Sequence, residues 1–244
     1  MCGRFAMNKE TDDLIQEYVA RGGDFHDWRP RYNIAPTDTV PVIREHDGER
    51  RLAGVRWGIV PPSSPTFGGG KPIINARIET VTKNKLFATP FAEHPCIVPA
   101  LGYYEWRATP DGKQPYFVHA PEGDMAMAGI IRPWFDRAAA QKAEQEGEEI
   151  DPWLLSMAVI TLDAHVAPGE VHDRMPAFLS RDAIDEWLGG ELDPDDRVNL
   201  LQLTSLEVAD RLEYHPVSRD VNSVRNEGPH LVEPIEETPQ PALF

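Results

Sequence analysis

The apolar residues of this chain occur in short runs separated by proline and glycine, and this pattern restricts the fold more than any other feature. No run approaches the ~18 consecutive apolar residues that a membrane-spanning helix needs. The runs have the length and the β-branched or aromatic content that are typical of strands. They are RLAGVRWGIV (51–60), CIVPAL (96–101), PYFVHA (115–120), MAMAGII (125–131) and LLSMAVITL (154–162), preceded by a proline-rich stretch (28–43) that predicts a loop leading into a strand.

A few segments between these runs have helical patterns. Residues 8–21 place Leu14, Ile15, Tyr18 and Val19 on one apolar face before a Gly-Gly stop. Further helices are expected at 180–190 and at 193–204, where Asp193 is a cap and Pro194 the first helical residue, and a solvated helix or insertion at 136–151. We therefore predict one α+β domain with many short strands and a few peripheral helices, spanning residues 2–234, with an acidic, proline-rich tail at 235–244 that is expected to be mobile.

The charge of the chain is unusual. The net charge is −16, and the cations are mainly arginine, with 24 lysines and arginines together against 40 acidic residues. A strongly acidic, lysine-poor surface keeps a protein soluble by self-repulsion, as in halophiles. A salty cytoplasm is therefore one hypothesis. We expect a cytoplasmic protein, because a reducing cytosol suits a Cys2 that functions as a thiolate. The overall charge argues against nucleic acid as a partner, but a local basic groove remains compatible with it because salt screens charges beyond ~8 Å.

Two cysteines, Cys2 and Cys96, are too few for a disulfide framework. The start of the chain lacks the pattern of a secretory signal. The eight histidines are scattered without metal-ligand spacing, and GGGK at 68–71 lacks the second half of a phosphate-binding loop. The sequence thus predicts no metal and no cofactor.

The position of Cys2 is itself a candidate for chemistry. Removal of Met1 would leave a free α-amine and a thiol on adjacent carbons, a pair that can react in ways that neither group can alone. The simpler interpretation is a frayed and unimportant chain end.

Polar residues also occur inside strand-like segments. INARIET (74–80) puts Asn75, Arg77 and Glu79 on alternate positions of an extended segment, a face that could hold a phosphate. Glu105 lies between Tyr104 and Trp106, and a carboxylate among aromatic residues is desolvated, which raises its pKa towards neutrality. In each case an ordinary solvated strand face is the alternative.

The segment GEVHDRMPAFL (169–179) places His172, Asp173 and Arg174 together on an expected loop. Histidine is the natural proton carrier near neutral pH. A lone histidine is more often structural, but the charged triplet on this expected loop makes a functional site an equal alternative.

These stretches occur together in a known pattern. The sequence resembles the SOS response-associated peptidase (SRAP) family, the DNA–protein crosslinking proteins that shield abasic sites in single-stranded DNA. The resemblance runs in order along most of the chain. It rests on MCGRF (1–5), RYNIAPT (31–37), RWGIVP (56–61), INARIET (74–80), CIVPALGYYEW (96–106), AGI (128–130), HDRMP (172–176) and PVSRDVNSVRNEGPHLVEP (216–234).

The resemblance implies a single α+β domain with a curved, barrel-like β core, mixed or antiparallel, and a positively charged channel for single-stranded DNA. It implies a monomer that needs no cofactor. It implies a nucleophilic Cys2 that forms a thiazolidine with the abasic site, autocatalytic removal of the residues before it, and weak lyase activity. The implied catalytic residues are Cys2, Asn75, Glu105 and His172, and the implied DNA-binding residues are Arg4, Arg77 and, less directly, Arg174.

Two positions depart from the family pattern. The stretch PPSSPTFGGG (61–70) lacks the aromatic residue that usually follows there and wedges against the bases, and Phe67 is a candidate substitute. His165 stands where the family usually has asparagine. The contacts made from both positions are therefore open.

Two other functions compete with this one. The first is a cysteine hydrolase with Cys2 or Cys96 as nucleophile, His172 as base and Asp163 or Asp173 as orienting group, since such triads are assembled in space. Cys96 lies in an apolar run, which favours an inert buried thiol. The second is a non-covalent reader of modified bases in DNA, which would not require Cys2 near the chain end.

If the acidic surface is an adaptation to salt, the melting temperature of the protein will rise steeply with KCl up to molar concentrations, because counterions relieve the self-repulsion. A thermal melt followed by circular dichroism at increasing KCl measures this. A melting temperature that does not change with salt would contradict the hypothesis.

Overall fold

The computed structural model describes residues 2–18, 25, 28–121, 123, 125–165, 171–189 and 191–236 of the 244-residue chain. Its central feature is a closed ring of five strands. The ring runs β10–β4–β3–β6–β9 and back to β10, with β10 parallel to β4 and every other pair antiparallel. The strands are β3 (Thr39–His46), β4 (Glu49–Trp57), β6 (Pro95–Ala100), β9 (Met125–Phe135) and β10 (Trp153–Asp163). The expected barrel-like, mixed β core is confirmed.

Three short strands extend the ring. β5 (Asn75–Arg77) runs parallel to β10, β11 (Arg174–Pro176) pairs with the end of β10, and β12 (Phe178–Leu179) pairs with β9. Since β5 and β11 both pair with β10, the segments that carry Asn75 and His172 are brought to the same end of this strand.

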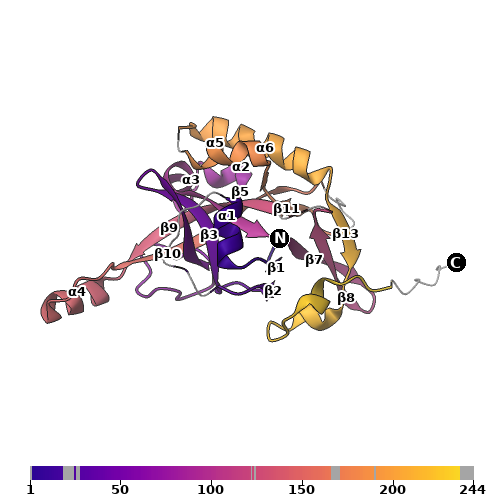
Figure 1. Ribbon diagram of the computed structural model, residues 1–244, viewed down its shortest axis with the longest axis horizontal. Helices are drawn as coiled ribbons and strands as arrows, with labels where there is room; N and C mark the ends of the chain where they lie inside the picture. Colours follow the sequence, from indigo (N-terminus) through magenta and orange to yellow (C-terminus); the bar gives the residue numbers. More distant parts are fainter. Residues whose placement is uncertain are drawn as a thin grey trace.

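A second, five-stranded antiparallel sheet lies beside the barrel in the order β13–β8–β7–β1–β2 (Figure 1). Its strands are β1 (Phe5–Met7), β2 (Arg31–Ile34), β7 (Gly102–Thr109), β8 (Gly112–His119) and β13 (Glu213–Pro216). The segment that begins with Cys2 therefore leads directly into a strand inside a sheet.

Strand β1 is buried on both faces. Phe5 and Met7 point into the main core, where Phe5 packs edge-on against Trp57 with ring centroids 5.1 Å apart. Ala6 points to the opposite side, into a smaller core with Tyr104, Phe117, Val217, Val221 and Leu231. Because successive side chains of a strand point to opposite faces, β1 joins the barrel to the C-terminal segment. The chain end is thus fixed by packing, which is contrary to the interpretation of a frayed terminus.

The helices are peripheral, as the sequence predicts. α5 (Ile184–Leu188) and α6 (Pro194–Ala209) cover one side of the barrel, and α4 (Arg137–Glu146) lies at the far end of the β9–β10 hairpin (Figure 1). Asp193 caps α6 by accepting from Asp195 N and Asp196 N. The remaining helices are short: α1 (Thr11–Glu17), α2 (Ile78–Val81), α3 (Ala88–Glu93), and the 3-10 turns η1 (Arg181–Ala183), η2 (Arg219–Asn222) and η3 (Pro229–Val232).

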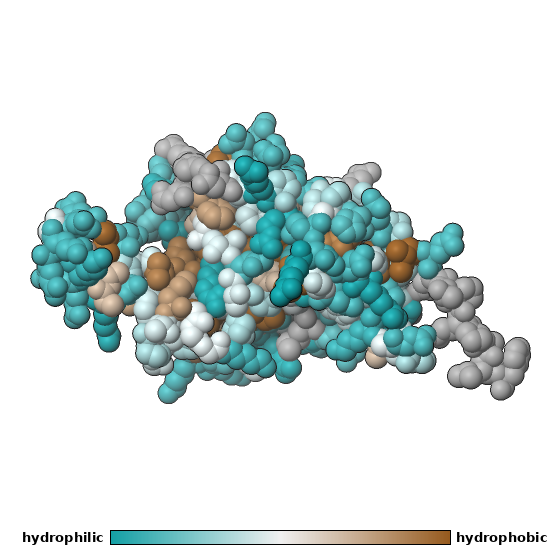
Figure 2. All heavy atoms as spheres, turned by 90° about the horizontal axis from the view of Figure 1, so that it is seen from below, coloured by the Kyte–Doolittle hydropathy of each residue, from teal (hydrophilic) through white to brown (hydrophobic). Residues whose placement is uncertain are grey.

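The face shown in Figure 2 is covered mainly by hydrophilic residues. Hydrophobic residues reach the surface next to the α4 arm, and Phe135, Trp153 and Leu154 of the strands that carry it are partly exposed. Among the described residues, no helix combines the length and apolar composition that a membrane span requires.

Two sequence predictions need correction or restriction. The segment 74–80 is extended only as far as Arg77, because Ile78 and Val81 bury their side chains at helical spacing in α2; Glu79 therefore leaves the strand face of Asn75 and Arg77. The first helix is shorter than 8–21, and Val19 and the Gly-Gly pair fall outside the described residues. Of the expected tail, residues 237–244 are also outside them, whereas Ile235 N–H donates to Pro216 O.

Candidate active site

Cys2 lies at the entrance to β1 and is fully buried in the unprocessed chain. Its carbonyl oxygen accepts a hydrogen bond from Asn75 Nδ2 at 3.0 Å, and its thiol lies 3.8 Å from Arg4 O. Burial, and secondarily the negative charge of Glu105, raise the pKa of the Cys2 thiol far above its usual value. The sulfur is therefore a neutral thiol, while Asn75 fixes the backbone beside it.

Glu105 comes from β7, the strand next to β1. The two strands are joined by Tyr104 N–H donating to Arg4 O at 3.0 Å. Glu105 is only 4% exposed, and burial raises the pKa of its carboxyl group from 4.5 to about 7. A carboxyl group that is half protonated near neutral pH can give or take a proton, which confirms the desolvated carboxylate that the sequence predicts.

His172 approaches from the turn before β11 and is half-buried. Its Nδ1 accepts a hydrogen bond from Arg174 N–H at 3.0 Å, so the neutral ring carries its proton on Nε2. Burial lowers the pKa of His172 below its usual value. The imidazole is therefore neutral at pH 7 and better suited to accept a proton than to release one.

A surface cavity of about 520 Å³ lies at this site; Glu105 and His172 line it, whereas Cys2 and Asn75 are not among its lining residues. Arg4, Glu105 and His172 line one part of it, as the sequence analysis anticipates. The other lining residues, which the sequence analysis does not single out, are Trp106, Lys113, Arg219 and Asn222. Arg219 and Asn222 lie in the block 216–234 that resembles the SRAP family, so the resemblance could have pointed to them. No sequence pattern points to Lys113.

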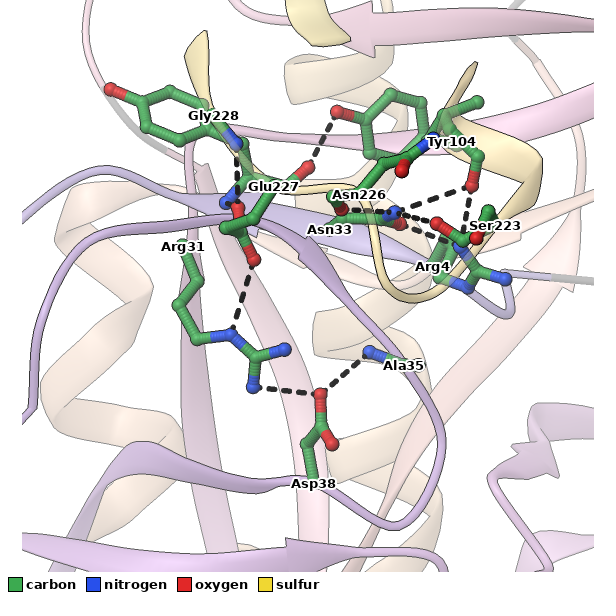
Figure 3. Close-up of polar contacts among 12 residues, drawn as sticks. Arg4, Arg31, Asn33, Ala35, Asp38, Tyr104, Ser223, Asn226, Glu227 and Gly228 are labelled. Carbon is green, nitrogen blue, oxygen red and sulfur yellow. Dashed lines mark hydrogen bonds and ion pairs between the residues drawn. The ribbon is translucent and has the colours of Figure 1, made fainter. Parts of the chain in front are cut away.

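Arg4 is held on this cavity by several contacts. Its Nη1 donates to Asn33 Oδ1 at 2.6 Å and to Val221 O at 2.7 Å (Figure 3), and its guanidinium lies 5.9 Å from the centre of the Trp106 ring. Asn33 is itself fully buried. The arginine is thus a preorganised cation with donors left for an incoming anion.

Arg77 and Arg174 differ from this arrangement. Arg77 is exposed at the end of β5, two residues beyond Asn75, and does not line the cavity. Arg174 donates to Glu79 and Asp163 carboxylates, both through Nη1 at 2.6 Å, and to Thr161 O. Two carboxylates neutralise this arginine, so its contacts fit a residue that positions His172 better than one that binds phosphate.

The geometry bears on the alternative hydrolase in which Cys96 is the nucleophile. Cys96 is fully buried in β6, where burial raises the pKa of its thiol, and it does not line the cavity that holds His172. Asp163 is engaged with Arg174, while Asp173 is exposed. This geometry provides no orienting carboxylate between Cys96 and His172.

The two departures from the family pattern have visible environments. Phe67 packs against Trp134 with ring centroids 5.8 Å apart, and Trp134 Nε1 donates to Ser64 O. His165 is exposed, and its backbone N–H lies 3.5 Å from Met175 Sδ. Within the described part of the chain, no group of three or more His, Cys, Asp or Glu residues could hold a metal ion.

Comparison with known proteins shows the family of the chain. The family model of the SOS response associated peptidase (SRAP) matches residues 1–224. The chain belongs to the SRAP family. Two of its SRAP relatives are the abasic site processing proteins YoqW of Bacillus subtilis, 33% identical, and YedK of Escherichia coli, 31% identical. Each alignment covers 96% of this chain, with 99% of YoqW and 100% of YedK.

A solved structure supports the fold of this SRAP chain independently. A protein from Bacteroides thetaiotaomicron superposes with a TM-score of 0.75 at 20% sequence identity, covering 96% of this chain and 100% of the other. At this identity, the likeness shows the fold alone.

The raised pKa of Glu105 has a consequence for stability. The folded protein holds the Glu105 proton more tightly than the unfolded chain does. The contribution of this proton to the free energy of unfolding is therefore complete below about pH 4.5 and is lost as pH rises through 7. We expect Glu105→Gln to remove this loss, gaining about 3 kcal/mol over wild type between pH 4.5 and 8. Urea unfolding at both pH values measures it.

Glu79→Gln is the matched control with the opposite sign. Burial acts to raise the pKa of Glu79, but the hydrogen bond and charge of Arg174 outweigh it and lower the pKa. This variant should lose stability relative to wild type as pH rises to 4.5 and above, because the folded wild type binds the Glu79 proton less tightly than the unfolded chain does. A Glu105→Gln difference that is the same at every pH would contradict the buried, raised carboxyl group.

Proposed function

We propose that Cys2, after removal of Met1, forms a covalent thiazolidine with abasic sites in single-stranded DNA and so shields them. One observation carries the proposal: the cysteine that would begin the processed chain is fixed by Asn75 beside a buried carboxyl group whose pKa is about 7. SRAP membership and the names of the relatives YoqW and YedK, both abasic site processing proteins, support it.

The chemistry follows from the two groups of an N-terminal cysteine. An abasic deoxyribose is in equilibrium with a ring-opened aldehyde. The α-amine, with a pKa of ~7.7–8, is partly neutral at pH 7 and attacks the aldehyde carbon, which gives a carbinolamine. Loss of water gives an imine. The Cys2 sulfur then adds to the imine carbon, and its proton passes to the nitrogen, which closes a five-membered ring. Tethering of the thiol favours this closure.

The neighbouring groups have separate roles in this proposal. Glu105 in its protonated form donates to the departing hydroxyl of the carbinolamine, and the carboxylate takes the proton back. Asn75 holds the Cys2 backbone. His172, neutral at pH 7, accepts the proton of the anomeric hydroxyl when the sugar ring opens and delivers it to the ring oxygen, which leaves as a hydroxyl group. Arg4 and the exposed Arg77 bind the DNA backbone.

Further properties belong to the same proposal. The imine makes strand cleavage by β-elimination possible, so weak lyase activity is expected. Autocatalytic removal of residues before Cys2 would use Glu105 and Asn75. We propose that the protein acts as a monomer on DNA in the cytoplasm or nucleoid.

A denaturing gel tests the central step. Full-length protein purified after Met1 removal is mixed with single-stranded DNA carrying one abasic site, at low and high salt. We expect a heat-stable band at the combined mass of protein and DNA. Cys2→Ala and a chain with an acetylated α-amine should give no such band, because each lacks half of the ring-forming pair. Cys2→Ser should give at best a weak, reversible adduct.

Cys96→Ala is the matched control, since it removes the other thiol and should crosslink as wild type does. The absence of a heat-stable band with wild type at either salt concentration would overturn the proposal. Peptide cleavage that depends on Cys96 would favour a hydrolase, and binding seen only on native gels would favour a non-covalent reader.

The rate of crosslinking should have a bell-shaped dependence on pH. It rises as the α-amine loses its proton and falls as Glu105 loses its own, so the maximum lies between about pH 7 and 8. Glu105→Gln should lower the maximum by about 10² or more and remove the alkaline fall. Single-turnover rates at constant ionic strength measure both. If the crosslinking rate of Glu105→Gln kept the same bell-shaped pH dependence as wild type, Glu105 would be excluded as the acid.

A further inference from the structure

A second cavity, of about 780 Å³, lies at the opposite end of β10 from Asn75 and the His172 turn. β4 pairs with β10 only at Arg56 and Trp57 of β4. The β3–β4 hairpin and the β9–β10 hairpin, which extends towards α4 (Figure 1), both continue beyond this point and leave the cavity between them. Its volume is within the range of ~300–1,000 Å³ that is typical of small-molecule sites.

Apolar side chains form part of the wall of this cavity. Ala53 of β4, Pro133 of β9 and Leu155 of β10 are among its lining residues. Trp153, also in the lining, is 51% exposed, and its ring packs edge-on against Phe135 with ring centroids 5.0 Å apart. A partly exposed apolar wall with an oriented aromatic ring favours a ligand that has an apolar body.

Two arginines of the lining lie side by side on the β3–β4 hairpin. Arg44 of β3 is directly opposite Arg51 of β4 in the antiparallel register. Side chains at opposed positions share a face, with Cβ atoms ~4.5–5.5 Å apart, and like charges there repel. Burial lowers the pKa of Arg44, and the charge of Arg51 lowers it further. The pair is therefore a local concentration of positive charge on a chain whose net charge is −16.

The protein itself compensates this pair only in part. Among the described residues, the Nε atoms of both arginines are buried without a hydrogen-bond partner. Arg51 Nη2 donates to Glu49 Oε2 at 2.9 Å, whereas Arg44 has no hydrogen bond or ion pair within the described part of the chain. Asp151 and Glu45 also line the cavity, and the charge of Asp151 acts on Arg44 without forming an ion pair with it. A half-buried guanidinium in this state has donors for an oxyanion, and binding one offsets the cost of its burial.

Two further groups at the cavity are part of the same positive field. Arg132 of β9 lines it, and its Nη1 donates to Leu86 O at 2.9 Å. His94, which precedes β6, lines it too. Desolvation lowers the pKa of His94, and the charges of Arg44 and Arg132 lower it further, although Glu93 opposes them. The histidine is therefore mainly neutral at pH 7, and its titration reports the charge around it.

We propose that this cavity binds a small organic anion. Its phosphate or carboxylate group accepts hydrogen bonds from Arg44 and Arg51, and its apolar body lies along Pro133, Leu155 and the exposed ring of Trp153. Both kinds of oxyanion match the planar donor pattern of a guanidinium. The two cavities share no lining residue, so this site is independent of the proposed reaction at Cys2.

Fluorine NMR with three probes tests the site in the full-length protein. 4-Fluorophenyl phosphate and 4-fluorobenzoate carry the two anionic groups on the same ring, and 4-fluorobenzyl alcohol carries no charge. Titrations at neutral pH and low salt give the dissociation constants, with inorganic phosphate as a competitor. We expect at least one anionic probe to bind roughly tenfold or more tightly than the alcohol. The tighter of the two identifies the chemical class of the ligand.

Arg44→Gln removes the charge but keeps a polar side chain. We expect a loss of roughly tenfold or more in affinity for the anionic probes and no change for the alcohol, because charge-assisted hydrogen bonds are lost. In wild type, a bound anionic probe should also raise the pKa of His94, since it offsets the charge of the arginines. The ring-proton signals of His94, assigned by their loss in His94→Gln, measure this.

A purely structural role for Arg44 predicts a different outcome. Without a ligand, Arg44→Gln should melt no lower than wild type, because it removes a half-buried cation that Arg51 repels. An anionic probe should raise the melting temperature of wild type and leave that of Arg44→Gln unchanged. Circular dichroism measures both.

Arg211→Gln is the matched control, because it removes the same charge from an exposed side chain outside the cavity and should bind the probes as wild type does. Equal binding of the alcohol and the anionic probes, undiminished affinity in Arg44→Gln, or an equal loss in Arg211→Gln would overturn the site. If Arg44→Gln weakened the binding of single-stranded DNA while neither anionic probe bound, the arginines would hold nucleic acid, and the proposal would also be wrong.

Discussion

The burial of β1 between two apolar cores is the constraint on which the rest of the site depends. Phe5 and Met7 belong to the barrel core, whereas Ala6 belongs to the smaller core beneath the C-terminal segment. A strand packed on both faces cannot slide by one residue without moving each side chain to the wrong core. The position of Cys2, three residues before Phe5, is therefore as well defined as any part of the fold.

The same burial determines the chemistry of the site. Glu105 lies on the neighbouring strand within the same enclosed region, so its carboxyl group loses hydration and its pKa rises to about 7. The Cys2 thiol is kept neutral for the same reason. A neutral thiol suits a reaction in which an amine attacks first and sulfur adds later, because the amine then meets the aldehyde without competition from a thiolate.

An acidic protein that binds DNA is not a contradiction, since binding depends on local charge. Arg4 is oriented by Asn33 and Val221 on the cavity, whereas Arg174 is neutralised by Glu79 and Asp163. Two arginines that look equivalent in sequence thus have different capacities for phosphate. Screening by salt confines the repulsion between DNA and the remaining acidic surface to short range. Salt also weakens the first, non-covalent binding of DNA, but a covalent product does not dissociate with salt.

Much of this site could be anticipated from local sequence, and the remainder depended on contacts between distant segments. The short apolar runs, the caps of the helices and the carboxylate between two aromatic residues are local patterns, so the α+β class and the special environment of Glu105 followed from them. Glu79 was misplaced because tertiary burial of Ile78 and Val81 turned an extended-looking segment into a helix.

By itself, the sequence determined which groups are available: an early cysteine, a carboxyl group among aromatic residues, and a histidine beside an arginine. Only the tertiary structure decided which of them meet. β10 brings Asn75 and the His172 turn to one end of the barrel. The Asn33 amide links Arg4 to Ser223 of the C-terminal segment by hydrogen bonds. These contacts join residues far apart along the chain, and their geometry depends on the closure of the ring and on packing that no local pattern records.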